Sequence, residues 1–182
     1  EKVDPRLLIS LDRFRDSKAD IGKFRDIGHL VGINRFNQAG GGILEDFDND
    51  GRLDLAVTTF DCTQPMSLYR NAGDGQFVEV TKTAGLEDQL GGLNCSQTDY
   101  NNDGWVDLLV IRGAWLGQFG RHPDSLVRNN GDGTFTDVSF DAGIGEFAYP
   151  SQTAAWGDYD QDGDLDLYVG NETNQNLQAP CL

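Results

Sequence analysis

The chain has 182 residues and a formal net charge of −16, from 30 Asp and Glu against 14 Lys and Arg. This acidic excess opposes nucleic acid or an anionic membrane surface as a partner and favours a cation as the counter-charge. No apolar run approaches the roughly 20 residues that a membrane-spanning helix needs, so we expect no membrane span.

The first predicted element is an N-terminal segment, residues 1–22, that forms a linker or a short helix. Asp4 can cap this helix and Pro5 can occupy its first turn, with the helix continuing to Arg15. The segment precedes the first repeat marker. It can therefore join the repeats to an upstream domain, form an interface or cover an exposed edge, and the sequence does not choose among these.

From residue 23 onward the chain repeats with a period of about 55 residues. The repeat marker is a Phe followed eight residues later by a Gly, and its three copies begin at Phe24, Phe77 and Phe135. An acidic loop follows each marker Gly after 14, 14 and 15 residues, a phase held too closely for chance. We expect repeats at 23–76, 77–134 and 135–182, the last of them truncated within a unit.

Short apolar runs within each repeat predict strands. Leu53–Val57, Val106–Ile111 and Leu165–Val169 are bounded by Gly, Asn and Asp, and the Asn-Gly and Asp-Gly pairs are typical of tight hairpin turns. Four strands in about 55 residues, repeated in tandem, indicate β-propeller blades. The sequence thus predicts an all-β fold of about three four-stranded blades. Closed propellers need about four to eight blades, so we expect part of a larger or partner-completed propeller.

Three acidic loops carry the strongest chemical signal. Each has oxygen-bearing side chains at positions 1, 3, 5 and 9, a Gly at position 6 that permits a sharp turn, and a variable position 7 whose backbone carbonyl can bind a cation. The predicted metal ligands are Asp46, Asp48, Asp50, Arg52 and Asp54 in the first loop, Asp99, Asn101, Asp103, Trp105 and Asp107 in the second, and Asp158, Asp160, Asp162, Asp164 and Asp166 in the third.

These loops predict about three Ca²⁺ ions. They hold twelve Asp and one Arg, hence eleven of the sixteen net negative charges, and such clusters repel themselves without a cation. Ca²⁺ accepts six to eight oxygen ligands, whereas Mg²⁺ prefers a rigid octahedron that keeps several waters. Plain solvated turns and an EF-hand are the alternatives. An EF-hand needs a Glu at position 12, where this chain has Val57, Val110 and Val169 within apolar strands.

The repeat unit Phe-x-Asp-Val with the loop Trp156-Gly-Asp-Tyr-Asp-Gln-Asp-Gly-Asp resembles the FG-GAP/VCBS repeats of integrin α-type propellers. Within them it is similar to the subgroup of ASPIC/UnbV and cartilage acidic protein-like sequences. The resemblance implies a seven-bladed propeller in an extracellular protein, with Ca²⁺ held in the blade loops and adhesion or ligand recognition as the usual role. Asn101, a neutral residue at position 3, departs from this pattern and predicts a weaker second site.

The leading functional hypothesis is a calcium-stabilised scaffold without catalytic residues that binds a protein or carbohydrate ligand. Asp164 and the insertion Trp115–His122 are the candidate recognition residues, although an insertion packed against the neighbouring blade explains its aromatic residues equally well. One alternative is part of a calcium-dependent enzyme acting on polysaccharides. Another is an assembly subunit whose open blades associate with one another.

Localisation is expected to be extracellular or at the cell surface, because such sites suit millimolar calcium. The sequons at Asn94 and Asn171 are compatible with secretion. The three Cys and two His form none of the patterns typical of zinc, haem or thioredoxin-type sites. Spacing leaves open whether Cys62 and Cys95 form a disulfide, and the state of Cys181 is open as well.

Overall fold

The structure, a computed structural model, describes residues 25–35, 40–113, 122–146 and 148–171. These residues are all-β, as the sequence predicts, with one turn of 3-10 helix, η3 (Gly28–Leu30). The expected N-terminal helix, Cys181 and the insertion up to residue 121 lie outside the described residues. In the described part of the chain, no helix is long and apolar enough to cross a membrane.

The strands form three antiparallel sheets. The first sheet contains β1 (Gly42–Glu45), β2 (Asp54–Val57), β3 (Ser67–Gly73) and β4 (Gln76–Glu79), in that order. The second contains β5 (Asn94–Thr98), β6 (Asp107–Ile111), β7 (Ser125–Asn129) and β8 (Phe135–Asp137), also in order. The third pairs β9 (Ser151–Gly157) with β10 (Asp166–Asn171). Two four-stranded meanders and a two-stranded sheet are consistent with propeller blades, and the described residues form no closed propeller.

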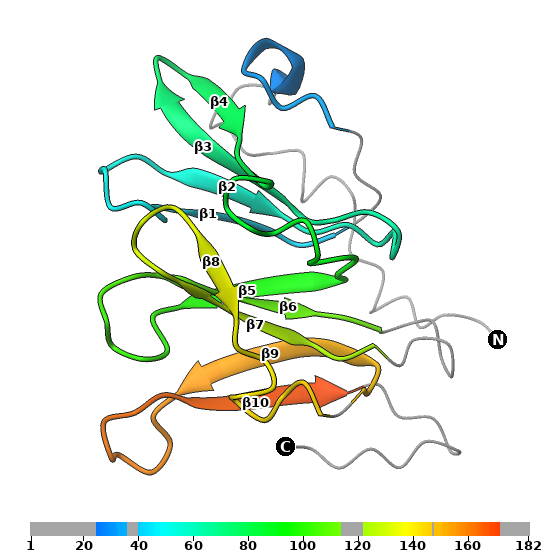
Figure 1. Cartoon of the computed structure of the whole chain (residues 1–182), viewed down its shortest axis with the longest axis vertical. Helices are drawn as coiled ribbons and strands as arrows, with labels where there is room; N and C mark the ends of the chain where they lie inside the picture. Colours follow the sequence, from blue (N-terminus) through cyan, green and yellow to red (C-terminus); the bar gives the residue numbers. More distant parts are fainter. Residues whose placement is uncertain (1–24, 36–39, 114–121, 147, 172–182) are drawn as a thin grey trace, which may run out of the picture.

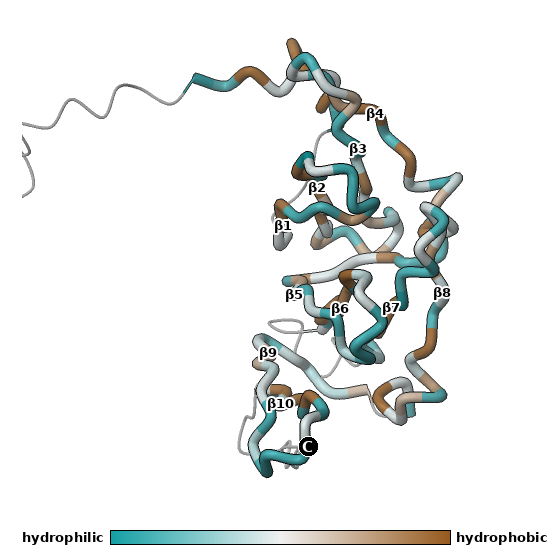
Figure 2. Tube along the Cα trace, turned by 90° about the vertical axis from the view of Figure 1, so that its left-hand side faces the viewer, coloured by the Kyte–Doolittle hydropathy of each residue, from teal (hydrophilic) through white to brown (hydrophobic). Residues whose placement is uncertain are grey.

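The sheets are stacked one above another, with the β1–β2, β5–β6 and β9–β10 loops on the same side (Figure 1). The first strands β1, β5 and β9 lie along one side of the stack, and the last strands β4 and β8 lie along the other (Figure 2). β1 also contacts β5, and β5 contacts β9. The stacking therefore brings all three acidic loops to one face of the molecule.

The largest hydrophobic core lies between the first two sheets. β6 is buried along its length because sheets flank it on both faces, and residues 108–111 are each at most 1% exposed. In β10, by contrast, the side chain of Tyr168 is 53% exposed. The core cluster consists of Ile43, Phe47, Ala56, Met66, Leu68, Ala84, Leu86, Leu108, Val110, Val127 and Phe135.

The Phe and Gly of the repeat marker join neighbouring repeats. The backbone N–H of Phe77 donates to the carbonyl of Val31 at 2.8 Å, and that of Phe135 to the carbonyl of Ala84 at 2.9 Å. Gly32 has a φ of 91°, and a Cβ there would lie 2.4 Å from the Phe77 carbonyl oxygen. Because these Phe residues lie in β4 and β8, the sheets and the sequence repeats are offset by one strand.

The structure contains one of the hairpin turns that the sequence predicts. The Gly73-Asp74-Gly75 segment is a tight turn with φ of 86°, 52° and 72°, which confirms the prediction of a hairpin turn there.

The sequence left open whether two cysteines form a disulfide. Cys62 and Cys95 are both free thiols, so they are not joined to each other. Cys95 is hydrogen-bonded to Thr58 instead, and burial raises the pKa of its thiol to about 11.

Candidate metal centres

The three acidic loops have one backbone conformation. The Gly at position 6 has a φ of 86°, 88° or 98° in the first, second and third loop, as a sharp turn requires. The residue at position 4 is also left-handed, with φ of 55° at Asn49, 57° at Asn102 and 63° at Gln161. This second left-handed position was not predicted from the sequence. Two of the three residues there are Asn, a residue enriched in this conformation, and that was the available signal.

The same hydrogen bonds recur inside each loop. The position-1 carboxylate accepts the N–H groups of positions 5 and 6, at 3.0 and 2.8 Å in the first loop, 3.0 and 2.8 Å in the second, and 3.1 Å for both in the third. The position-5 carboxylate accepts the position-7 N–H at 2.9 Å in all three. These bonds fix the direction of the side chains at positions 1 and 5.

Position 9 connects each loop to its sheet. Asp54 accepts the N–H of position 2 at 3.3 Å and that of Asn71 in β3 at 2.8 Å. Asp107 accepts the equivalent bonds at 3.2 Å and, from Asn129 in β7, at 2.7 Å. These two carboxylates are buried, whereas Asp166 is exposed and accepts the position-2 N–H at 2.8 Å. Each position-9 residue therefore supports its loop, whatever ligand role it also has.

Carboxylates converge in the first and third loops. In each of these loops, three side chains offer oxygens that all lie within 4.8 Å of one another. Ca²⁺–oxygen distances are about 2.3–2.6 Å, so one ion can contact oxygens up to about 5 Å apart. The donor sets therefore fit a hard cation such as Ca²⁺. The converging residues are Asp46, Asp48 and Asp50 in the first loop and Asp158, Asp160 and Asp166 in the third.

The structure does not bring all the predicted ligands together. Asp54 in the first loop and Asp162 in the third lie outside the converging groups. In the second loop, Asp99, Asp103 and Asp107 form no such group. Asn101 occupies position 3 there, and its amide nitrogen donates to the Asp103 carboxylate at 2.9 Å. A neutral side chain turned toward a carboxylate is the physical reason to expect weaker cation binding by this loop.

Position 7 differs between the loops, as expected for a residue used through its backbone. Arg52 pairs with the Asp50 carboxylate and donates from Nε to the Asn71 carbonyl at 3.0 Å. Trp105 packs so closely over Gly131 that a Cβ on Gly131 would lie 2.6 Å from the indole. Asp164 is exposed. Arg52 thus offsets part of the negative charge of the first loop. The other two loops have no positively charged residue at this position.

The electrostatics of the loops favour a bound cation. Burial raises the pKa of Asp107 to about 6, and repulsion from Asp103 and Asp99 raises it further. The N–H groups that donate to its oxygens lower the pKa but do not outweigh these effects. Burial also raises the pKa of Asp48, followed by repulsion from Asp50. A cation among these carboxylates would stabilise their ionised forms.

The comparison with protein families decides what these loops belong to. The model of the FG-GAP-like repeat matches residues 46–110 and again residues 99–169. The chain belongs to the FG-GAP-like repeat family. Each match begins at the first residue of an acidic loop and continues through the next loop, so the family's repeat coincides with the loops described above.

Two curated relatives are similar to this chain over nearly its whole length. Cartilage acidic protein 1 from Xenopus tropicalis is 28% identical over 174 residues, which cover 93% of this chain and 25% of that protein. Cartilage acidic protein 1 from Homo sapiens is 26% identical over 187 residues, covering 99% of this chain and 26% of that protein. The chain therefore spans about a quarter of the length of these curated relatives.

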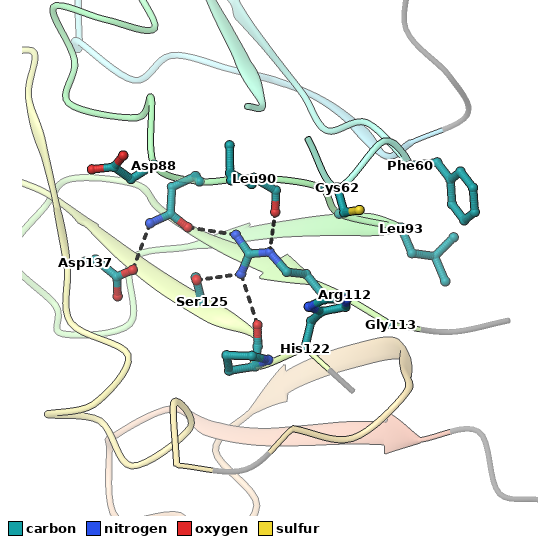
Figure 3. A pocket seen from close by; sticks show the side chains of 14 residues that line it. Phe60, Cys62, Asp88, Leu90, Leu93, Arg112, Gly113, His122, Ser125 and Asp137 are labelled. Carbon is teal, nitrogen blue, oxygen red and sulfur yellow. Dashed lines mark hydrogen bonds between the residues drawn. The ribbon is translucent and has the colours of Figure 1, made fainter. Parts of the chain in front are cut away.

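A second polar cluster surrounds Arg112, which is 9% exposed (Figure 3). Its guanidinium donates to the carbonyls of Leu90 and Pro123 at 2.7 and 3.2 Å. It also donates to the Ser125 hydroxyl at 2.6 Å and to the Gln89 side chain at 2.9 Å. Arg112 therefore connects two parts of the chain by hydrogen bonds. One part is the segment between the first and second sheets, and the other is the start of β7. Sequence reasoning missed this cluster, because its residues belong to no repeated motif.

This cluster borders a cavity of about 410 Å³ that also includes Phe60, Cys62 and His122 (Figure 3). Phe60 follows the end of β2 and Arg112 follows the end of β6, whereas the acidic loops precede these strands. The cavity therefore lies at the strand ends opposite the acidic loops. Of the candidate recognition residues, His122 lines this cavity and Asp164 belongs to the third loop.

Proposed function

We propose that this chain is part of an extracellular FG-GAP propeller in which Ca²⁺ stabilises the blade loops and the opposite face binds a protein or carbohydrate ligand. The observation that carries the proposal is the conformation shared by three loops, two of which bring three carboxylates within 4.8 Å of one another. Acidic side chains alone do not require such a geometry, whereas an ion with several oxygen ligands does.

The proposed role of the ions is structural. Each loop closes a hairpin between the first two strands of a sheet, and Asp54 and Asp107 tie the first and second loops to the third strand. An ion held there would fix the hairpin and neutralise mutually repelling carboxylates. The proposal therefore includes no catalytic step.

The proposed recognition face is the one with the Arg112 cavity, because the acidic loops are committed to ions. Its walls combine an aromatic ring, Phe60, with polar groups of Arg112 and His122. Mixed apolar and polar lining of this kind is typical of ligand sites. The extracellular location rests on the millimolar calcium that such sites suit. The relatives are named for acidity, a property that this chain shares through its charge of −16.

One further observation favours a role in assembly: among the described residues, the third sheet has two strands. Leu167 and Val169 in β10 line a cavity of about 300 Å³ together with Ile144. The equivalent positions in β6, Leu108 and Val110, pair with β7 and are fully buried. We propose that a strand equivalent to β7, supplied by the rest of the protein or by a second copy, adds to β10.

The test is to titrate the chain with Ca²⁺ in an isothermal calorimeter. Three bound ions are expected, with the second loop the weakest. Asn101→Asp supplies the missing carboxylate at position 3 and should strengthen the weakest site on the order of tenfold, because ligand charge tunes affinity. Asn102→Asp is the matched control, since it adds the same charge at the exposed position 4, and it should change the affinity far less. Equal effects of both substitutions, or no calcium binding, would contradict the assignment.

A further inference from the structure

Asn129, the last residue of β7, is 1% exposed, and both polar groups of its side chain are paired. Its backbone N–H donates to the Asp107 carboxylate of the second loop at 2.7 Å. Its side-chain amide donates to the carbonyl of Phe47 at 2.8 Å and to that of Val106 at 3.2 Å. Its side-chain oxygen accepts the N–H of Gly131 at 3.0 Å. Asn129 therefore touches the first and the second acidic loop at once.

Asn71 is the equivalent residue of the first sheet. Comparing it with Asn129 shows which bonds of Asn129 lie within its own sheet and which one reaches the other sheet. Asn71 donates from its backbone to Asp54 at 2.8 Å, from its side chain to the Leu53 carbonyl at 3.1 Å, and accepts the N–H of Gly73 at 3.0 Å. These bonds match those of Asn129 within the second sheet. The bond from Asn129 to the first loop has no counterpart at Asn71 among the described residues.

Phe47, which receives this bond, lies at position 2 of the first loop and is 4% exposed. Its N–H donates to the Asp54 carboxylate at 3.3 Å, so the two sides of its backbone connect Asp54 to Asn129. Its ring packs edge-on against Phe135 of the second sheet, with centroids 6.1 Å apart. The backbone of the first loop therefore cannot move without disturbing a residue that holds Asp107.

A second connection joins the same two loops at the surface. The side-chain amide of Asn49, at position 4 of the first loop, donates to the Gly104 carbonyl at position 6 of the second loop at 3.2 Å. Asn102 is the position-4 residue of the second loop, and its side chain makes no hydrogen bond of this kind within the described part of the chain. The first and second loops are thus joined by one buried and one exposed hydrogen bond.

We propose that Asn129 is a positioning residue shared by the first two calcium sites, so that an ion in one loop strengthens binding in the other. The inference rests on the proposed function, because it concerns the affinities of those sites. Binding an ion fixes the loop that surrounds it, and through Asn129 it restrains the second loop as well. The next ion then binds a loop that is already ordered, which produces positive coupling.

The test reads the second loop through Tb³⁺ luminescence sensitised by Trp105, the indole at position 7 of that loop, in a chain in which Trp115→Phe and Trp156→Phe remove the other indoles. Ca²⁺ competition converts the signal into a calcium affinity. Disabling the first loop with Asp48→Asn and Asp50→Asn should weaken the second loop about fivefold or more. In a chain that also carries Asn129→Ala, the same change to the first loop should have a much smaller effect on the second, because only the exposed bond from Asn49 to Gly104 still joins the loops.

Asn71→Ala is the matched control, because it removes the same contacts within a sheet but leaves Asn129 in place. In that chain, disabling the first loop should still weaken the second about fivefold. If the second loop is indifferent to the first in the chain with Asn129 intact, coupling is refuted while calcium binding stands. If Tb³⁺ and Ca²⁺ do not bind at all, the proposed function fails and the coupling with it.

A second pair of variants covers the case in which Asn129→Ala does not fold. Asn49→Gly keeps the left-handed position and removes only the exposed bond to Gly104, whereas Asn102→Gly removes a side chain that makes no such bond. The first substitution should reduce the coupling and the second should leave it unchanged. Equal coupling in both chains would overturn the role of direct contacts between the loops.

Discussion

Asp124 is a buried carboxyl group outside the metal loops. It is 9% exposed and accepts the backbone N–H of Arg112 at 2.7 Å. Burial raises its pKa to about 6, against the opposing effects of the Ser151 hydroxyl, that N–H group and the charge of Arg112. The folded pKa thus lies above the unfolded value of about 3.9. The ionised carboxyl therefore destabilises the native state, and protonation relieves this cost.

This shift predicts a pH dependence of stability. Because the native state binds the proton more tightly, the contribution of Asp124 to stability falls as pH rises from about 4 to 6, by about 3 kcal/mol. Asp124→Asn keeps an acceptor for the Arg112 N–H and cannot ionise. Urea unfolding at pH 4 and pH 7 should show a loss of stability that is about 3 kcal/mol smaller in the variant than in the parent chain. A loss remains in both chains, because burial also raises the pKa of Asp107 to about 6. The same pH dependence in both chains would show that Asp124 does not titrate in this range.

At the scale of elements, the segment between the first two sheets is packed closely at Gly92. Its φ is 128°, and a Cβ there would lie 2.9 Å from the Thr58 side chain and 3.0 Å from that of Val110. Thr58 follows β2 and Val110 lies in β6, so Gly92 sits where the two sheets meet. A side chain at this position would push the sheets apart.

Gly92→Ala should therefore lower the free energy of unfolding by about 2–4 kcal/mol, from backbone strain and overpacking together. Gly133 is the control, because it also has a positive φ of 84°, but a Cβ added there would meet no atom within 4 Å. Gly133→Ala should cost only about 1 kcal/mol of backbone strain. Chemical unfolding measures both, and equal costs would mean that Gly92 does not hold the sheets in contact.

Elements that repeat could be predicted from the sequence, and contacts that occur once could not. Apolar runs and turn residues predicted β2, β6 and β10, and the spacing of Asp46, Asp48 and Asp50 predicted a group that the structure brings together. Arg112 and its partners lie up to 23 residues apart and share no pattern, so only the folded chain reveals them. Asn129 has an equivalent in the first sheet, Asn71, but its bond to Phe47 spans 82 residues and depends on how the sheets stack.

At the scale of the whole molecule, the stacked sheets carry their acidic loops on one face (Figure 1). Three such loops hold eleven of the sixteen net negative charges, so their repulsion opposes the folded state when no cation is present. An ion that binds only the native loops stabilises the fold by about 2.7 kcal/mol at a hundredfold excess over its Kd. Calcium should therefore determine how stable the stack of sheets is.

The most direct test of a structural role for calcium is thermal unfolding of the chain in excess EDTA, in millimolar Ca²⁺ and in millimolar Mg²⁺. We expect the Tm to rise by roughly 5 °C or more in Ca²⁺ relative to EDTA, with little change in Mg²⁺. An equal Tm in EDTA and in Ca²⁺ would contradict this role, and the acidic loops would then be turns that hold no structural ion.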